Sequence, residues 1–190
     1  MVAHPLNLFD CCSTTDGASA VLVCDAATAK QFTDTPVYVT GFGTASDYLA
    51  IHDRVSTVTL EGTRKASGAA YRMAGLGPKD IQLAEVHDCF TIAELLAYED
   101  LGFCEKGRAG QYLDEGHTQI GGDRPVNASG GLKSKGHPIG STGTGQAYEM
   151  FNQLRGTVQK PARQVKDAER GLVHNVGGSG GTVAVSILER

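Results

Sequence analysis

A short polar run, His87-Asp88-Cys89-Phe90, follows directly after an apolar segment and could carry chemistry. Cys89 stands between the expected end of a strand and the expected first turn of a helix, where the helix dipole and unpaired N–H groups favour a thiolate. His87 can donate a hydrogen bond to a ligand oxygen. The alternative is a buried thiol beside a core histidine in a tight turn, and these four residues alone do not decide between the two.

A second candidate is the glycine-rich run over residues 130–140, in which His137 stands between Gly136 and Pro138. Glycine lets the backbone approach a ligand closely, and proline fixes the chain beside the imidazole. Histidine is the side chain best matched to proton transfer near neutral pH. The alternatives are a solvated surface loop and a phosphate-binding loop, although no nucleotide-binding glycine pattern fits. The segment predicts a proton-handling histidine.

The third candidate covers residues 174–181, HNVGGSGG, and lies between two strand-like segments. A flexible linker would not be bounded by strand patterns on both sides. A turn with outward backbone N–H groups, able to hold an oxyanion, fits better. Asn175, Gly177 and Gly178 are therefore candidate substrate-binding residues, together with Gly136 of the second segment.

A zinc site built from His87, Cys89, His137 and His174 is a further alternative. No Cys-x₂-Cys or paired-His spacing supports it. The other four cysteines lie in ordinary contexts, before a strand, at a strand end or after a helix. The sequence therefore predicts no metal.

Strand-like and helix-like segments alternate along the chain. Strands are expected over residues 18–24, 36–42, 81–86, 171–176 and 182–188, and helices over 26–32, 60–75, 91–102 and from 146 onward. Thr91 and Glu94 fit a capping box at the third of these helices. The alternation predicts one α/β domain over residues 1–190, with a mostly parallel sheet covered by helices on both faces. Reactive groups in such sheets gather beyond the carboxyl ends of the strands.

The composition excludes several functional classes. The formal net charge is −4 and no Lys/Arg run occurs, which argues against nucleic acid or an anionic membrane surface as a partner. No apolar run approaches the ~18 residues of a membrane span. Five cysteines without framework spacing indicate reduced thiols, so we expect a cytoplasmic protein.

Taken together, the three segments resemble the C-terminal half of the thiolase superfamily, and in particular the sterol-carrier-protein thiolases. The resemblance covers nearly the whole chain, through PLNLFDCCSTTDGASAVLV, AEVHDCFTIAELLAYEDLG, NASGGLKSKGHPIGSTG and HNVGGSGG. The pattern GGLxSKGHPxGxTG is highly specific. The resemblance implies a five-stranded, mostly parallel α/β half that packs on a similar half, with the active site between them.

The same resemblance implies roles for individual residues. His137 would activate a nucleophilic cysteine and help to bind the thioester oxygen. Most thiolases carry an acid–base cysteine where this chain has Asn175, and Cys89 resembles its replacement in the sterol-carrier branch. His87 and the Gly177 N–H would contribute to oxyanion binding. No cysteine here stands in the context of the family's nucleophile, which lies in the other half.

The expected function is therefore that of an acyl-CoA thiolase half that acts on a CoA thioester without a bound cofactor. Its expected partner is an N-terminal half with the nucleophilic cysteine, in a hetero-oligomer or dimer. Two alternatives remain. One is a retro-aldolase subunit of steroid side-chain degradation, and the other is a non-catalytic subunit that binds acyl-CoA or lipid.

Overall fold

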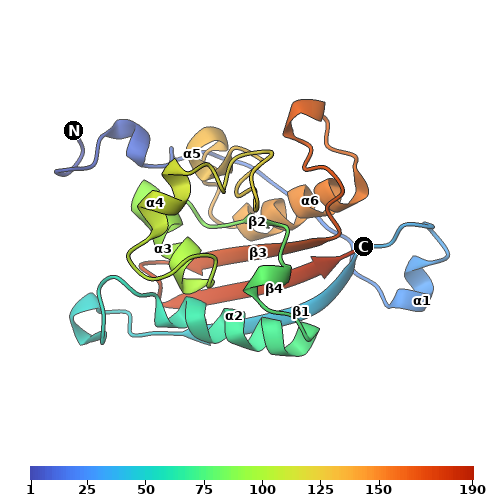
Figure 1. Ribbon diagram of the computed structural model, residues 1–190, viewed down its shortest axis with the longest axis horizontal. Coiled ribbons are helices and arrows are strands. Elements are labelled where there is room, and N and C mark those ends of the chain that lie inside the picture. Colours follow the sequence, from blue (N-terminus) through green and yellow to red (C-terminus); the bar gives the residue numbers. More distant parts are fainter.

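A computed structural model describes all 190 residues and contains a four-stranded sheet in the order β1-β4-β3-β2 (Figure 1). The strands are β1 (Tyr38–Ser46), β2 (Leu83–Glu85), β3 (Arg170–Gly177) and β4 (Thr182–Glu189). The pairs β1–β4 and β4–β3 are antiparallel, and only β2–β3 is parallel. The prediction of a mixed α/β sheet is confirmed, but the predicted fifth strand and mostly parallel pairing are wrong. A four-residue turn joins β3 to β4, and so short a connection can only give antiparallel neighbours.

Helices cover both faces of the sheet, as predicted. The helices are α1 (Ala26–Ala29), α2 (Glu61–Ala74), α3 (Thr91–Asp100), α4 (Ala109–Asp114), α5 (Gly131–Lys135) and α6 (Thr142–Arg155). Short 3₁₀ turns lie at Leu8–Asp10, Ile51–Asp53, Pro78–Asp80 and Pro161–Arg163. In Figure 1, α2 lies along one face and α6 lies on the other side of the sheet. Both α4 and α5 fall between residues 102 and 146, where the sequence predicted no element.

The α2 face is packed backbone against backbone. A Cβ atom at Gly41 or Gly43 of β1 would collide with the carbonyl groups of Ala70 and Ala66 of α2, so only glycine fits at these two positions. Ala66 and Ala70 are fully buried. The side chains of β4 that point to this face complete the cluster, and all are fully buried: Val183, Val185 and Ile187. Small residues thus bring helix and sheet unusually close.

The α6 face uses larger side chains. Met150 and Leu154 of α6 are fully buried and belong to a cluster with Val173 of β3 and Leu188 of β4. A Cβ at Gly171 would collide with the sulfur of Met150, so this glycine makes room for the methionine. The helix predicted from residue 146 onward is therefore confirmed, although it begins earlier, at Thr142.

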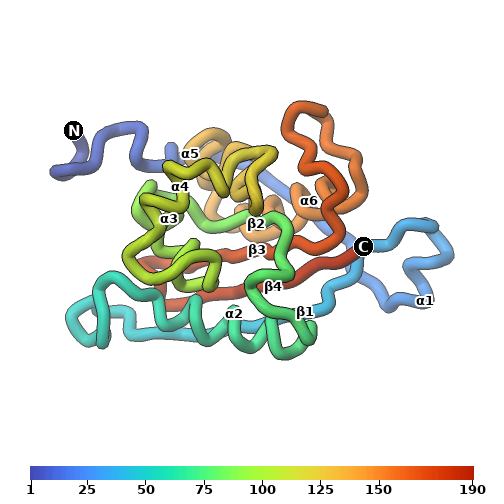
Figure 2. The backbone as a smooth tube through the Cα atoms, in the orientation of Figure 1, coloured from blue at the N-terminus to red at the C-terminus, as the bar shows by residue number.

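The segment over residues 18–24, predicted as a buried strand, forms no strand. Leu22 is fully exposed, with a relative exposure of 103%, and Val21 and Val23 are exposed as well. Figure 2 shows the first part of the chain, in blue, extending away from the body on both sides. An apolar run becomes a strand only where another strand can pair with it, and no strand of this chain does so.

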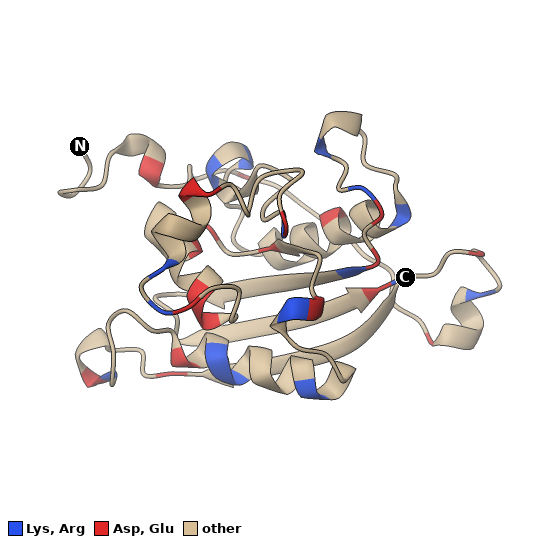
Figure 3. Cartoon of the chain, viewed as in Figure 1, with Lys and Arg blue, Asp and Glu red and all other residues tan.

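Charged residues of both signs are intermixed along the chain and occur in most parts of the molecule (Figure 3). None of the helices has both the length and the apolar character needed to cross a membrane.

Candidate functional site

The candidate residues meet at one edge of the sheet, beyond the carboxyl ends of β2 and β3. His87 follows β2, and Asn175 lies near the end of β3. His137 precedes α6 and brings its ring against that of His87, edge to face, with 4.9 Å between ring centroids and 81° between ring planes. The predicted gathering at the strand ends is thus observed for both histidines and Asn175.

His87 is a neutral imidazole at neutral pH. His87 is only 4% exposed. Burial, followed by the nearby His137, lowers the pKa of His87 to about 4. On its other side the Asn175 side-chain nitrogen lies 3.4 Å from His87 Nδ1. The ring therefore contacts the His137 ring and the Asn175 amide.

Asp88 connects the His87 turn to the His137 loop. Its carboxylate accepts hydrogen bonds from the backbone N–H groups of Leu132, at 2.7 Å, and Lys133, at 3.4 Å. These are first-turn N–H groups of α5, which have no partner inside the helix. A Cβ at Gly131 would collide with the same carboxylate, so glycine is required there. Asp88 thereby fixes the segment that leads to His137.

Glu94 adds a second connection between these segments. It forms an ion pair of 2.8 Å with Lys133 and accepts hydrogen bonds from Tyr98 and Asn127. Phe90, not Thr91, is the N-cap of α3, and its side chain makes no capping hydrogen bond. The predicted capping box is therefore wrong, because Glu94 is engaged by residues from elsewhere in the chain.

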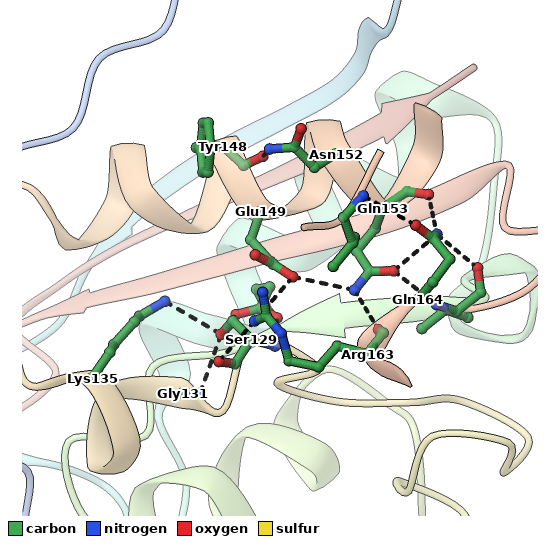
Figure 4. Close-up of polar contacts among 12 residues, drawn as sticks. Ser129, Gly131, Lys135, Tyr148, Glu149, Asn152, Gln153, Arg163 and Gln164 are labelled. Carbon is green, nitrogen blue, oxygen red and sulfur yellow. Dashed lines mark hydrogen bonds and ion pairs between the residues drawn. The ribbon is translucent and has the colours of Figure 1, made fainter. Parts of the chain in front are cut away.

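A third set of contacts holds the same loop against α6 (Figure 4). The buried carboxylate of Glu85 accepts hydrogen bonds from Ser129, at 3.0 Å from the backbone nitrogen and 2.6 Å from the hydroxyl. Arg163 donates to the Ser129 carbonyl at 3.1 Å and lies 3.6 Å from Glu149 of α6. Burial raises the pKa of Glu85 to about 7, although the bonds from Ser129 lower it.

Cys89 is half-buried just after His87. Burial, followed by the neighbouring Cys12, raises the pKa of the Cys89 thiol to about 11. The prediction of a stabilised thiolate is therefore wrong for this chain, since desolvation outweighs the helix dipole. The Cys89 carbonyl also accepts a hydrogen bond from the Cys12 N–H at 2.9 Å. The protonated Cys89 thiol can therefore act as a proton donor.

The glycine segment after Asn175 forms the tight turn between β3 and β4. Gly178 and Gly180 have φ of 59° and 99°, and the Gly180 N–H donates to the Gly177 carbonyl at 3.2 Å. Arg54 anchors the turn through the Ser179 carbonyl at 2.6 Å. Gly177 and Gly178 are exposed. The segment is no linker, and oxyanion binding by Gly177 stays a prediction.

Gly136 has a backbone conformation suited to glycine, with φ of 84°. A Cβ here would collide with Thr15. The next residue, His137, donates its backbone N–H to the Ser13 carbonyl at 3.0 Å. The early segment of the chain thus lies directly against the His137 loop and fixes its course.

An open cavity of about 1000 Å³ lies on the α6 side, between residues 15–19, the loop before α5, and Arg163. None of His87, Cys89 and His137 lines it. These three candidate residues therefore lie at the strand edge and outside this cavity. No three His, Cys, Asp or Glu side chains come together in a way that could hold a metal ion.

Comparison with known proteins identifies the family of the chain. A family model described as "Thiolase C-terminal domain-like" matches residues 43–190, so the chain belongs to the thiolase C-terminal domain family. It is 53% identical over its full length to the acetyl-CoA acetyltransferase of Methanothermobacter thermautotrophicus, and 38% identical over 96% of its length to sterol carrier protein 2 of Gallus gallus. The chain spans 49% and 34% of the lengths of these two proteins.

The fold also agrees with a solved structure, the Ltp2-ChsH2(DUF35) aldolase. The TM-score is 0.85 at 26% sequence identity, and the match covers 100% of this chain and 48% of that one. The predicted relationship to a thiolase C-terminal half is therefore confirmed.

Several residues of the site escaped the sequence analysis. Asp88 and Glu85 were not assigned roles, although a carboxylate at the end of an apolar strand was a visible signal. Gln146 and Thr142 carried no such signal. Their contacts, to Asn175 and His137 respectively, join residues at least five positions apart and depend on the folded loop.

Proposed function

We propose that this chain supplies the acid–base and oxyanion-binding residues of a thiolase-type acyl-CoA site. The reaction is thiolytic cleavage of a 3-ketoacyl-CoA, or its reverse, a Claisen condensation. The nucleophilic cysteine lies on the other half, which is either joined to this chain or separate. The observation that carries the proposal is the edge-to-face contact of His87 and His137, with Cys89 two residues after His87, in a chain that belongs to the thiolase C-terminal domain family.

In the cleavage direction, the nucleophilic cysteine adds to the 3-keto carbon and the bond between C2 and C3 breaks. The electron pair of that bond leaves as the enolate of the shorter CoA thioester. Cys89 gives its thiol proton to the α-carbon, and the resulting thiolate takes the proton of the incoming CoA thiol. The CoA sulfur then attacks the acyl-enzyme and releases the second CoA thioester. A thiol with a pKa of about 11 rests in the protonated form that the first transfer needs.

The oxygen atoms that become negative need hydrogen-bond donors. We assign these to His87, His137 and the Gly177 N–H. We further assign Gly136, Asn175 and Gly178 to substrate binding. His137 additionally accepts the proton of the nucleophilic cysteine, which a histidine can do near neutral pH.

The need for another half is supported by surface features of the chain. Phe9, Leu22 and Ile139 are 89%, 103% and 83% exposed, and Ile139 lies two residues after His137. Large apolar side chains exposed to this extent support a surface that another protein layer covers. The chain also spans about half the length of its acetyltransferase relative. We therefore place the other half over the edge that bears His87 and His137.

The likeness to the Ltp2-ChsH2(DUF35) aldolase supports a second candidate, retro-aldol cleavage of a β-hydroxyacyl-CoA without an acyl-enzyme. Cys89 argues for the thiolase reaction, because an aldolase needs no cysteine pair. A non-catalytic subunit that binds acyl-CoA or lipid is the third candidate.

The test is reconstitution. The 190-residue chain is combined with a thiolase N-terminal half that carries the nucleophile, and the loss of acetoacetyl-CoA or a longer 3-ketoacyl-CoA is measured. We expect a stable complex that is active, and neither half active alone. Turnover by this chain alone would contradict the proposal. Cleavage of only a β-hydroxyacyl-CoA would identify an aldolase, and binding without turnover would identify the non-catalytic subunit.

A further inference from the structure

A chain of side-chain amides runs from α6 to His87. Gln146 is fully buried, and its side-chain nitrogen donates to the His174 backbone carbonyl at 3.1 Å. A carbonyl oxygen can only accept, so this contact fixes which end of the Gln146 amide is nitrogen. The Gln146 side-chain oxygen then faces Asn175, whose nitrogen donates to it at 3.0 Å. The orientation of the Asn175 amide follows from that of Gln146.

The same Asn175 nitrogen lies 3.4 Å from Nδ1 of His87. An amide NH₂ group can only donate, so His87 Nδ1 must offer its lone pair. A neutral imidazole carries one proton, which must then be on Nε2. Since burial keeps His87 neutral at neutral pH, its tautomer decides which ring nitrogen donates a hydrogen bond and which accepts one.

His137 has the opposite arrangement. The Thr142 hydroxyl lies 3.2 Å from the Pro138 carbonyl, to which it can donate its single hydrogen, and 2.7 Å from His137 Nδ1. When the hydroxyl donates to that carbonyl, its oxygen accepts from His137, which places a proton on Nδ1 and leaves the Nε2 lone pair free. In that arrangement one ring of the pair donates from Nε2 and the other accepts there.

We propose that Gln146 and Asn175 are positioning residues that fix His87 as its Nε2–H tautomer, so that the His87–His137 pair is divided into a hydrogen-bond donor and a proton acceptor. The inference rests on the proposed function for its consequence, because the Nε2–H of His87 is what would bind the developing oxyanion. It assigns a role to Asn175, which stands where most thiolases carry a cysteine.

The tautomers can be measured without any enzyme activity. The 190-residue chain is labelled with ¹⁵N at its histidines, and long-range ¹H–¹⁵N spectra report which ring nitrogen is protonated. His87→Gln and His137→Gln identify the two sets of signals. We expect a proton on Nε2 of His87 and on Nδ1 of His137. A proton on Nδ1 of His87 in the unmodified chain overturns the proposal, whether or not any variant folds.

Asn175→Asp replaces the donor by a carboxylate of the same shape that can only accept. We expect His87 to become protonated on Nδ1 in this variant, with His137 unchanged. Thr142→Val is the matched control, and should change the His137 signals but not those of His87. An Asn175→Asp chain that folds and keeps a bare His87 Nδ1 would contradict the role of Asn175.

Kinetics of the assembled protein, meaning this chain with its other half, link the tautomer to the reaction. Asn175→Asp should lower kcat by on the order of 100-fold, as loss of an oxyanion donor does, with KM little changed. A changed tautomer with unchanged kcat would overturn the link to oxyanion binding. If the unmodified assembly shows no thiolysis while the spectra are as expected, the proposed function fails and the tautomer assignment stands.

Discussion

The α2 face and the strand edge that bears His87 are built on different principles. On the α2 face, Gly41 and Gly43 let helix and sheet meet almost without side chains, and the surrounding residues are apolar. At the strand edge, four consecutive residues are buried, and three of them are polar: Glu85, His87 and Asp88. Only Val86 in this run is apolar. Burying polar groups costs free energy unless each is hydrogen-bonded. Here Glu85, His87 and Asp88 each have such a partner. The edge therefore depends on specific polar contacts and the α2 face on close packing, so changes in the two regions should have separable effects.

The largest effect is expected for His137→Ala in the assembled protein. Without the imidazole the nucleophilic cysteine loses its proton acceptor and the oxyanion loses a donor, so both half-reactions slow. We expect kcat/KM to fall roughly 10³-fold or more. The free energy of unfolding of this chain should change little, because His137 is only partly buried. Loss of folding without specific loss of activity would place His137 with the structural residues.

Glu85→Gln should change how stability depends on pH. The folded chain holds the Glu85 proton up to a pKa of about 7, against 4.5 for an ordinary glutamate. Between these values the folded state binds more protons than the unfolded state, so stability falls as the pH rises from about 4.5 through about 7 and is level above that. The difference between the two pKa values corresponds to a decrease of about 3 kcal/mol in the free energy of unfolding. Urea unfolding at several pH values measures it.

The glutamine variant keeps the shape of Glu85 but cannot ionise, so its stability should lack this decline. Asp100→Asn serves as the control, because Asp100 is a buried carboxylate on α3, paired with Lys106 away from the candidate site. A Glu85→Gln chain that retains the full decline between pH 5 and 8 would show that another group carries the pH dependence.

A smaller effect is expected on the other face. Gly43→Val would push a side chain into the Ala66 carbonyl, and overpacking of this kind costs about 1–3 kcal/mol. The midpoint of urea unfolding should fall, while kcat of the folded, assembled enzyme stays the same. Gly110→Val is a control on α4, where an added Cβ meets no atom within 4 Å. A selective loss of kcat in Gly43→Val would remove the distinction between the two regions.

The sequence predicted well the elements that are determined locally. Residues 60–75 carry a helical pattern and end at Gly75, and the structure has α2 with Gly75 at φ of 69° as its C-cap. The two final strands were also predicted correctly, since apolar runs on either side of a glycine turn can pair with each other.

Elements that depend on distant contacts were not predictable. The helix α5 starts at Gly131 in a glycine-rich run, and this composition is typical of a loop. It is held by the Asp88 carboxylate, 44 positions away. The segment over residues 18–24 has the composition of a strand but finds no partner here. Motifs made His87, Cys89, His137 and Asn175 candidates, whereas the charge state of Cys89 depended on burial, which the motif does not show.

The most direct test of the account is the reaction of Cys89→Ala in the assembled protein with acetyl-CoA. Mass spectrometry reports acetylation of the nucleophilic cysteine on the other half, and formation of acetoacetyl-CoA reports condensation. The account predicts that the acyl-enzyme still forms while condensation and thiolysis are lost, because no group remains to move the proton at the α-carbon. Normal thiolysis in Cys89→Ala would contradict it and leave Cys89 as a packing residue.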